Sequence, residues 1–485
     1  MKGHSQQLLN PDAPLTSRTS FKRVFGHRFS FPNFIICLLW TKKQDIEKNL
    51  SDVMKKVVVI GSGISGLSAA YGLSKTHKVT LLEKASYFGG HSNTVDMVSN
   101  NKTIAVDTGF IVFNHRTYPN LISLFSDLSV PTEKSDMSFG VTVNNGQIQY
   151  AGSSIDQFFA QRYNLLNPKF LKMGLDIVRF NKAATTVDER ALDKMTLGDF
   201  ISRLDLGQGF RDWYLYPMAA AIWSTSTSKI PEYPARSFIQ FFKNHGLLTI
   251  TDHPQWYTVS GGSREYVKRI LDTPNIDAQL KVQIDSIHRH DDHVEVTFKD
   301  QDPQRFDECV IATHAPTALS LLANPTTEEQ QILGAFRYSK NKAYLHKDPV
   351  VMPRLKKAWA SWIYSDAVTQ DSSDKNPNDV SVSYWMNNLQ NLDTTEDIFV
   401  TLNPTASIKK DLIERIIDYD HPIFDAAAIK AQSEIHHIQG KKRTWFCGAY
   451  QRYGFHEDGI WSARRVLEGM GITPSWCLNE TESTA

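Results

Sequence analysis

Residues 57–66 read Val-Val-Val-Ile-Gly-Ser-Gly-Ile-Ser-Gly, and this stretch decides the fold. Its β-branched run predicts a strand that is buried on both faces of a parallel sheet. Of the glycines that follow, Gly61 permits a tight turn, Gly63 lets the backbone approach a pyrophosphate, and Gly66 lets the next helix pack on the strand. The free N–H groups where that helix starts, at Ile64-Ser65, favour phosphate charge. The stretch therefore predicts a dinucleotide-binding turn in an α/β fold.

A second predicted strand, Lys78–Leu82, ends in a carboxylate at the position where a ribose would be bound. Glu83 follows Gly61 by 22 residues, close to the spacing of about 20 that is typical of the ribose-binding acid. A carboxylate there accepts hydrogen bonds from both ribose hydroxyls and repels a 2′-phosphate. An ordinary βαβ unit that binds nothing is the competing interpretation, and the complete spacing argues against it.

The residues after Glu83 add a second glycine motif. They read Lys-Ala-Ser-Tyr-Phe-Gly-Gly-His from Lys84 to His91. The double glycine, Gly89-Gly90, resembles the second signature of flavoproteins in the amine oxidase superfamily. This resemblance implies that the backbone passes beside the pyrophosphate of FAD, and it places Lys84, Gly89, Gly90 and His91 at the cofactor. His91 stands where many relatives have Arg. A histidine there can still form a hydrogen bond, but it does not provide the permanent positive charge of Arg.

The C-terminal third carries an independent match to the same superfamily. Residues 445–449 read Trp-Phe-Cys-Gly-Ala, as at a strand end, and residues 454–463 read Gly-Phe-His-Glu-Asp-Gly-Ile-Trp-Ser-Ala. In the superfamily a helix begins here beneath the flavin ring, and its first N–H groups stabilise the charge that accumulates on reduction. Asp458 replaces the usual small residue, so we expect its side chain to cap the helix. The resemblance places four residues at the flavin: Gly448, Asp458, Gly459 and Ile460.

A narrower resemblance links the chain to a bacterial group of amine-oxidase-like flavoproteins. It rests on residues 107–114, 217–223, 261–266 and 454–459. The genes of this group often lie near cyclopropane-fatty-acid synthase-like enzymes, which implies a lipid acyl chain as substrate. This sequence departs from the group at Ser224-Thr225, where Cys-Pro is expected, and at Thr313, where Cys is common. In the wider superfamily a backbone amide near Val282 would hold the adenine.

The resemblance implies a discontinuous Rossmann-type flavin domain and an α+β substrate domain. The flavin domain is expected to comprise residues 54–120, 255–325 and 435–475. The substrate domain is expected to comprise residues 121–254 and 326–434, with amphipathic helical stretches at 171–181 and 200–216 and a tail at 476–485. We interpret residues 1–53 as a disordered extension or the product of a start codon placed too far upstream, because Met54 directly precedes the first strand. Their apolar run, 34–40, is too short to span a bilayer.

Composition excludes several other classes of protein. The net charge of +1 gives no electrostatic footprint for nucleic acid. The four cysteines are far apart and form neither a disulfide framework nor a zinc site, so we expect a reducing, cytoplasmic location and no metal. Those cysteines are Cys37, Cys309, Cys447 and Cys477. Cys447 does not match the flavin-linking cysteine of monoamine oxidases, so we expect non-covalent FAD.

Flavin chemistry requires a substrate carbon held near the flavin N5, away from water. The resemblance places Phe455 as an aromatic wall of the substrate site and Lys342 as a lysine that bridges through water to N5. Each assignment has an alternative. Phe455 could simply pack over the flavin ring, and Lys342 could be a solvated lysine on a strand. Because the chain has one dinucleotide fingerprint, we expect the organic substrate to reduce FAD, with oxygen or another carrier reoxidising it.

Three functions remain open from the sequence. The first is hydride transfer from a lipid acyl chain, with aromatic and leucine-rich segments lining a tunnel. These segments are Phe158-Phe159, residues 238–242 and Leu247-Leu248. A lipid substrate also predicts an apolar or basic surface for transient contact with the inner membrane. The second function is oxidation of a small amine, and the third is flavin binding without redox turnover. The oligomeric state stays open.

Overall fold

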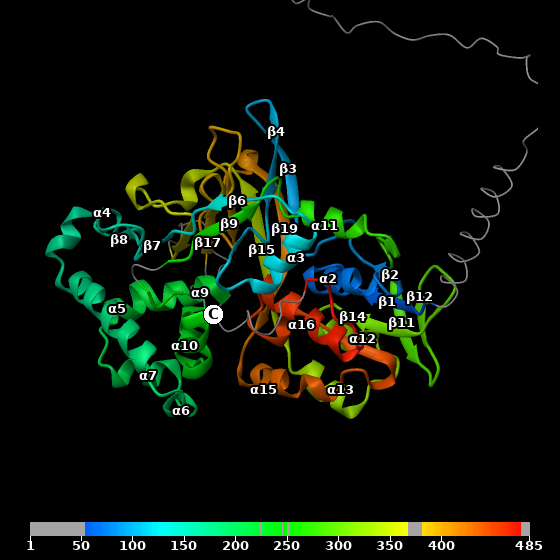
Figure 1. Ribbon diagram of the computed structural model, residues 1–485. Coiled ribbons are helices and arrows are strands. Elements are labelled where there is room, and N and C mark those ends of the chain that lie inside the picture. Colours follow the sequence, from blue (N-terminus) through cyan, green and yellow to red (C-terminus); the bar gives the residue numbers. More distant parts are fainter. Residues whose placement is uncertain (1–53, 224–225, 245, 250–252, 367–380, 477–485) are drawn as a thin grey trace, which may run out of the picture. The chain divides into compact units, whose positions relative to one another are not determined.

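The computed structural model describes residues 54–223, 226–244, 246–249, 253–366 and 381–476. The predicted extension at 1–53, Ser224-Thr225 and most of the tail lie outside the described residues. Within them, the nucleotide unit has the predicted elements: β1 (Lys56–Ile60), α2 (Ile64–Leu73) and β2 (Lys78–Leu82), with β1 and β2 parallel. Every residue of α2 is buried, because α2 lies between this sheet and α16 (His456–Gly469), as Figure 1 shows.

Close packing of α2 depends on its small residues. A Cβ on Gly66 would lie 1.9 Å from the carbonyl oxygen of Gly61, and one on Gly72 would lie 2.4 Å from Cδ1 of Leu467 in α16. The glycines therefore set how near the helix can approach both of its neighbours, as predicted for Gly66.

Five parallel strands form the nucleotide-binding sheet, in the order β10-β2-β1-β14-β20. The added strands are β10 (Ile276–Gln279), β14 (Glu308–Ile311) and β20 (Thr444–Phe446). Strands of this sheet come from all three segments expected in the flavin domain. The limits of the domains stay a prediction.

A seven-stranded sheet forms a second layer, in the order β19-β15-β18-β17-β16-β7-β8. Its strands are β7 (Phe139–Val143), β8 (Ile148–Ala151), β15 (Arg337–His346), β16 (Trp362–Ser365), β17 (Ser381–Trp385), β18 (Phe399–Leu402) and β19 (Ile413–Ile423). Smaller sheets pair β3 (Thr94–Ser99) with β4 (Lys102–Asp107), and β9 (Trp256–Val259) with β5 (Val112–Asn114) and β6 (Thr132–Ser135).

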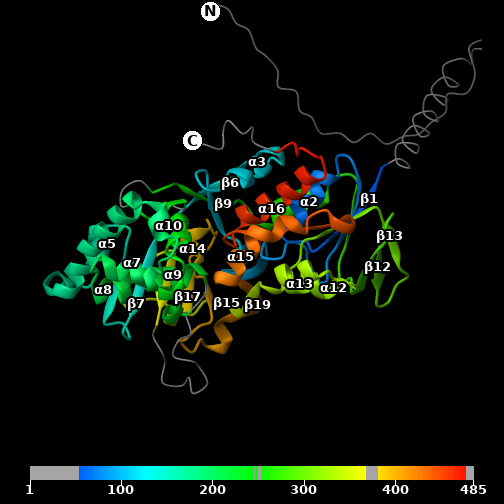
Figure 2. The same ribbon diagram turned by 90° about the horizontal axis from the view of Figure 1, so that it is seen from below.

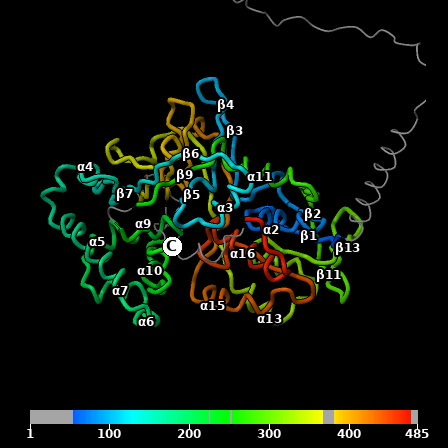
Figure 3. Tube along the Cα trace, in the orientation of Figure 1, coloured from blue at the N-terminus to red at the C-terminus, as the bar shows by residue number. Residues whose placement is uncertain are grey.

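Helices α4 to α10, which we call the helical lobe, pack beside this second sheet and away from β1 and β2 (Figures 2 and 3). They are α4 (Ile155–Phe158), α5 (Pro168–Thr186), α6 (Glu189–Leu192), α7 (Leu197–Arg203), α8 (Gln208–Phe210), α9 (Tyr216–Trp223) and α10 (Ala235–Asn244). The predicted stretch 171–181 lies in α5. The stretch 200–216 is not one helix, because the chain turns at Asp205, whose φ is +48°.

Most of the remaining helices cover the nucleotide-binding sheet and its edges, whereas α14 (Met386–Leu389) packs beside β17 of the seven-stranded sheet. The covering helices are α3 (Pro119–Asp127), α11 (Arg264–Leu271), α12 (Ala315–Leu321), α13 (Thr327–Gly334) and α15 (Ala426–Glu434). Among the described helices, none is both long and apolar enough to cross a membrane.

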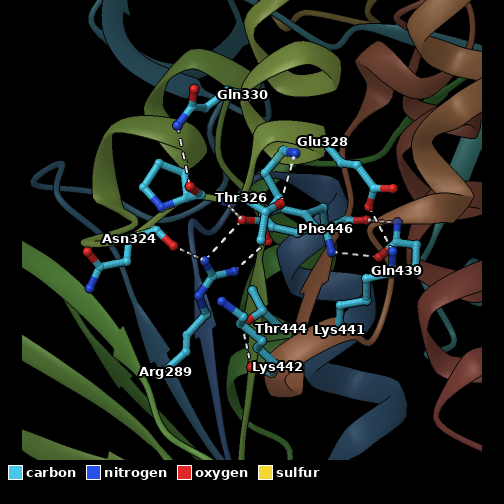
Figure 4. Close-up of polar contacts among 12 residues, drawn as sticks. Arg289, Asn324, Thr326, Glu328, Gln330, Gln439, Lys441, Lys442, Thr444 and Phe446 are labelled. Atoms are coloured by element: carbon cyan, nitrogen blue, oxygen red, sulfur yellow. Dashed lines mark hydrogen bonds and ion pairs between the residues drawn. The ribbon is translucent and has the colours of Figure 1, made fainter.

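A buried ion pair joins α13 to a β-hairpin. The hairpin is formed by β11 (Ile284–Arg289) and β12 (Val294–Phe298), with β13 (Gln304–Phe306) beside it. Arg289 donates to both carboxylate oxygens of Glu329, and the two side chains are only 3% and 2% exposed. Arg289 also donates to the Asn324 carbonyl at 2.6 Å (Figure 4). Burial alone would raise the pKa of Glu329, but the hydrogen bonds from Arg289 and Thr326 lower it. The pair therefore holds the hairpin against the helical cover.

Candidate functional site

A cavity of about 1360 Å³ runs from the glycine loop to the helical lobe. This exceeds the roughly 300–1,000 Å³ of a pocket for one small ligand. Its nucleotide end is lined by Gly61, Ser62, Gly63, Ile64, Ser65, Glu83, Lys84, Gly90, His91, Ala312, Thr313 and Gly448. Its other end is lined by Tyr150, Phe158, Ile177, Tyr214, Met218, Ile222, Trp223, Phe241, Leu247, Trp362 and Tyr384. The space suits a dinucleotide together with a second, apolar molecule.

The two predicted glycine motifs lie against each other at this cavity. Gly61 has a φ of +99°, which favours glycine. No heavy atom lies within 4 Å of where a Cβ on Gly63 would be, so that position opens onto free space. A Cβ on Gly90, in contrast, would lie 3.1 Å from the Cα of Gly63. No side chain therefore covers the backbone at Gly63, where a pyrophosphate would approach it, and the loop at Gly61–Gly66 fits FAD.

Glu83 is held in place at the mouth of the glycine loop. Its Oε2 accepts hydrogen bonds from the Ser62 N–H at 2.9 Å and from the Ser62 hydroxyl at 2.6 Å, and its Oε1 accepts from the Ala85 N–H at 2.8 Å. A carboxylate has about four acceptor sites, so capacity remains for a ribose hydroxyl. The predicted ribose contact therefore needs no rearrangement of Glu83.

His91 lines the cavity with a partly buried ring whose Nε2 atom is shielded from solvent. It stacks on Tyr419 with ring centroids 4.6 Å apart, and its Nε2 has no hydrogen-bond partner. Burial holds the pKa of His91 well below its usual value, and the nearby His421 and His314 lower it further. An unpaired buried nitrogen is costly, so Nε2 fits a hydrogen bond with a bound cofactor. The residue that replaces the usual Arg contributes no positive charge near neutral pH.

The first turn of α16 reaches the cavity through Phe455 and His456. Asp458 Oδ2 accepts a hydrogen bond from the Phe455 N–H at 2.9 Å, so this side chain caps the helix as expected. Burial raises the pKa of the Asp458 carboxyl to about 7. The N–H groups of His456 and Glu457 have no acceptor inside the helix and remain suited to an anion.

Glu457, the neighbour of His456, joins α16 to α3. Its carboxylate accepts hydrogen bonds from the N–H groups of Asn120 and Leu121, each at 3.0 Å, at the N-terminus of α3. The first turn of α16 is thereby anchored to the N-terminus of α3.

Several predicted site residues lie elsewhere. The Val282 N–H, assigned to adenine, donates to the Glu83 carbonyl at 2.9 Å, so that donor is already engaged. Gly459 and Ile460 do not line the cavity, because they belong to the second turn of α16. A Cβ on Gly459 would lie 2.6 Å from Cγ2 of Ile64, and Ile460 is fully buried in the core. The Val282 N–H is therefore not free for adenine, while the contacts of Gly459 and Ile460 with FAD stay predictions. Gly66 and Gly89 are also not among the residues that line the cavity.

Lys342 is not at the cavity. It lies directly opposite Asp418 in the pairing of β15 with β19, and its Nζ is 3.2 Å from Asp418 Oδ1. Its side chain is 61% exposed, while Asn341 and Ala343 face the core. The catalytic assignment of Lys342 is therefore wrong, since strand alternation turns this side chain to solvent.

Phe455, in contrast, is at the cavity, and its role as an aromatic wall of the substrate site stays a prediction. Its ring stacks on that of Phe241, with centroids 5.4 Å apart. Of the apolar segments expected in a tunnel, Phe158, Phe241 and Leu247 line the cavity. The others pack elsewhere. Tyr384 and Tyr453 add further aromatic lining.

Sequence reasoning missed a group of polar side chains beside His91. His314, Asp420 and His421 all line the cavity. The ring of His421 lies 5.5 Å from that of His91, and burial lowers the pKa of His421 to about 4. Asp420 pairs with Lys340 at 2.7 Å. No local motif signals this group, because its members are distant in sequence and only the fold brings them together. No three His, Cys, Asp or Glu side chains of the described chain are grouped to hold a metal ion.

Comparisons with known proteins agree with this architecture. A family model described as an NAD(P)-binding Rossmann-like domain matches residues 59–128. Flavin-containing amine oxidase A of Canis lupus familiaris is 26% identical over 274 residues, which cover 52% of this chain and 47% of that enzyme. The chain thus matches less than half the length of this relative.

Solved structures share the fold over most of the chain. Cyclohexylamine oxidase from Brevibacterium oxydans IH-35A has a TM-score of 0.61 at 15% identity, covering 86% of this chain and 100% of that one. A fatty acid isomerase from P. acnes that produces CLA has a TM-score of 0.60 at 13% identity, covering 86% and 99%. At these identities the likeness concerns the fold. Together with the glycine loop and the cavity, these findings show a Rossmann-like nucleotide-binding region at residues 59–128, and the fold of these solved structures over most of the chain.

Proposed function

We propose that the protein is an FAD-dependent oxidoreductase whose hydride donor is a long apolar molecule, such as the acyl chain of a lipid. The observation that carries this proposal is the second half of the cavity, where the lining is aromatic and aliphatic. A methylene chain gains free energy from such a lining in proportion to the apolar area that it buries. The fold is shared with a fatty acid isomerase and with amine oxidases alike, so the proposal depends on the lining of the cavity.

The carboxylates of the cavity argue against a small ammonium ion as substrate. Among the described lining residues they are Glu83, Asp136 and Asp420. Glu83 is engaged by the glycine loop, Asp420 pairs with Lys340, and Asp136 accepts hydrogen bonds from the Ser361 hydroxyl and the Ser138 N–H at 2.6 and 2.8 Å. A cationic amine would therefore meet no carboxylate that lacks a partner.

The chain's own residues supply binding and orientation. FAD, bound non-covalently, supplies a hydride acceptor at N5. The glycine loop and Glu83 would hold its phosphates and ribose, and the first turn of α16 would favour negative charge on the ring. Desaturation also releases a proton from the neighbouring carbon. His314 and His421 line the same cavity, and burial lowers the pKa of both. Both rings therefore favour the neutral form near pH 7, in which one nitrogen of each carries a free lone pair that can accept a hydrogen bond.

The test is anaerobic reduction of the bound flavin. We expect phospholipids or free fatty acids to bleach the flavin absorbance, with a product two mass units lighter for desaturation, and primary amines to leave it unchanged. Rapid bleaching by amines with none by lipids would show an amine oxidase. Bleaching by neither, in a protein that retains FAD, would favour flavin binding without turnover.

A matched pair of glycine variants tests the cavity itself. Gly174 lines the apolar end, and a Cβ there would have only Phe158 as a neighbour, at 3.7 Å. Gly174→Leu should block long chains while it leaves FAD bound. Gly334→Leu is the control, because Gly334 lies in a helix outside the cavity and its Cβ would meet Leu319 at 3.8 Å. Equal rates for both variants would contradict the proposed position of the substrate.

A further inference from the structure

Exposed aliphatic side chains are concentrated in one part of the helical lobe. Of the twelve large hydrophobic residues that are exposed in the described chain, seven lie between residues 155 and 178. Ile155, Leu166 and Leu175 are 82%, 87% and 68% exposed. Single exposed apolar residues are ordinary, but a cluster of this kind marks an interaction site.

Part of the cluster lies on one side of α5. Leu171, Leu175 and Val178 follow one another in α5 at intervals of four and three residues, so they share one side of the helix. The opposite side carries Phe170 and other buried core residues. The short helix η1 (Arg162–Leu166) packs on α5 and adds its exposed leucines directly before it. We call this surface, formed by α4, η1 and α5, the apolar face.

Cationic side chains flank the apolar face along α5. Helix α5 carries Lys169, Lys172, Arg179 and Lys182, all exposed. Its one acidic residue, Asp176, has a side chain that is only 1% exposed and pairs with both Lys172 at 2.9 Å and Arg179 at 2.8 Å. The exposed surface of this helix is therefore basic and aliphatic, although the whole chain has a net charge of only +1.

The inner side of the same helices lines the cavity. Phe158 of α4 and Gly174, Ile177 and Asn181 of α5 are all lining residues. Leu175 points to solvent from a position next to Gly174. One helix, with a diameter of about 10–12 Å, thus separates the apolar face from the apolar end of the cavity.

We propose that the apolar face is a docking surface for an anionic lipid bilayer. Aliphatic side chains flanked by lysine and arginine are the features by which surface helices bind such membranes. A second copy of this chain fits less well, because a symmetric contact would bring the two basic rims together. This inference concerns location and holds whichever molecule donates the hydride.

Vesicle co-sedimentation of the full FAD-loaded chain tests the proposal. The patch variant is Leu166→Glu with Leu175→Glu. The matched control is Val350→Glu with Leu355→Glu, which are aliphatic residues exposed outside the face, at 47% and 40%. We expect the wild type and the control to bind phosphatidylglycerol-containing vesicles, and the patch variant to lose about tenfold or more of its partitioning. Lys169→Gln with Lys182→Gln should weaken binding to these vesicles but not to pure phosphatidylcholine vesicles.

Two results would overturn the proposal. One is equal vesicle binding by the patch and control variants. The other is a wild-type dimer that the patch variant turns into a monomer, without any vesicle binding, which would assign the face to a second copy. Thermal melting and flavin content check that each variant is folded. Flavin reduction by substrate dispersed in detergent should be unchanged in the patch variant, so failure of the proposed function and failure of docking remain distinguishable.

Discussion

Replacing Gly63 with valine should separate cofactor binding from folding. Gly63 has φ −64° and ψ 175°, which any residue can adopt, and a Cβ would meet no heavy atom within 4 Å. The apo protein should therefore keep its stability to within about 1 kcal/mol. The added side chain projects into the space that a pyrophosphate would occupy, so FAD affinity should fall by about 100-fold or more, or roughly 3 kcal/mol.

Gly66→Ala is the contrasting variant. Its Cβ would lie 1.9 Å from the Gly61 carbonyl oxygen, so α2 has to move and the apo protein itself should melt earlier. FAD titration by flavin fluorescence and melting without added FAD measure the two effects. Unchanged FAD affinity in Gly63→Val, with unchanged melting, would show that this loop does not hold the cofactor.

Three further predictions address other parts of the structure. Arg289→Met leaves Glu329 buried without its partner and should cost about 3–5 kcal/mol in urea unfolding, whereas the double change with Glu329→Leu should recover much of the loss. Burial raises the folded-state pKa of Asp458 above its unfolded value, so the folded state holds the extra proton and wild-type stability should fall as pH rises from about 4 to 7. Asp458→Asn should flatten this dependence of stability on pH. Thermal melting of both proteins across this pH range is the measurement, and an equally steep dependence in the variant would contradict the assignment to Asp458. Lys342→Ala should leave the rate of flavin reduction unchanged. It should change the free energy of unfolding by less than about 1 kcal/mol, because the ion pair with Asp418 is exposed. A large fall in the reduction rate would show that Lys342 does act at the active site.

Local patterns were sufficient for the nucleotide unit. The alternation of a β-branched run, a glycine turn and a small-residue helix constrains the backbone within about 30 residues, and the predicted β1, α2 and β2 are confirmed. Capping by Asp458 followed for the same reason, since its partner at Phe455 is three residues away.

The sequence did not determine which side chains of a strand point to the cavity and which point to solvent. Lys342 has the right residue type in a strand, yet the register of β15 against β19 turns it toward Asp418 and solvent. A shift of one residue would have turned it inward, and nothing local sets that register. The Val282 amide failed as a prediction because its acceptor, the Glu83 carbonyl, is about 200 residues away.

The sequence by itself therefore determined the Rossmann turn, the glycines that leave room for a pyrophosphate, and the carboxylate at the ribose position, because these depend on spacing along one short segment. Only the tertiary structure decided which histidines surround His91, that burial keeps these rings neutral, and that the aliphatic side of α5 remains exposed. Those properties depend on long-range packing, since the pKa of a histidine and the exposure of a leucine are set by neighbours that the chain brings in from distant positions.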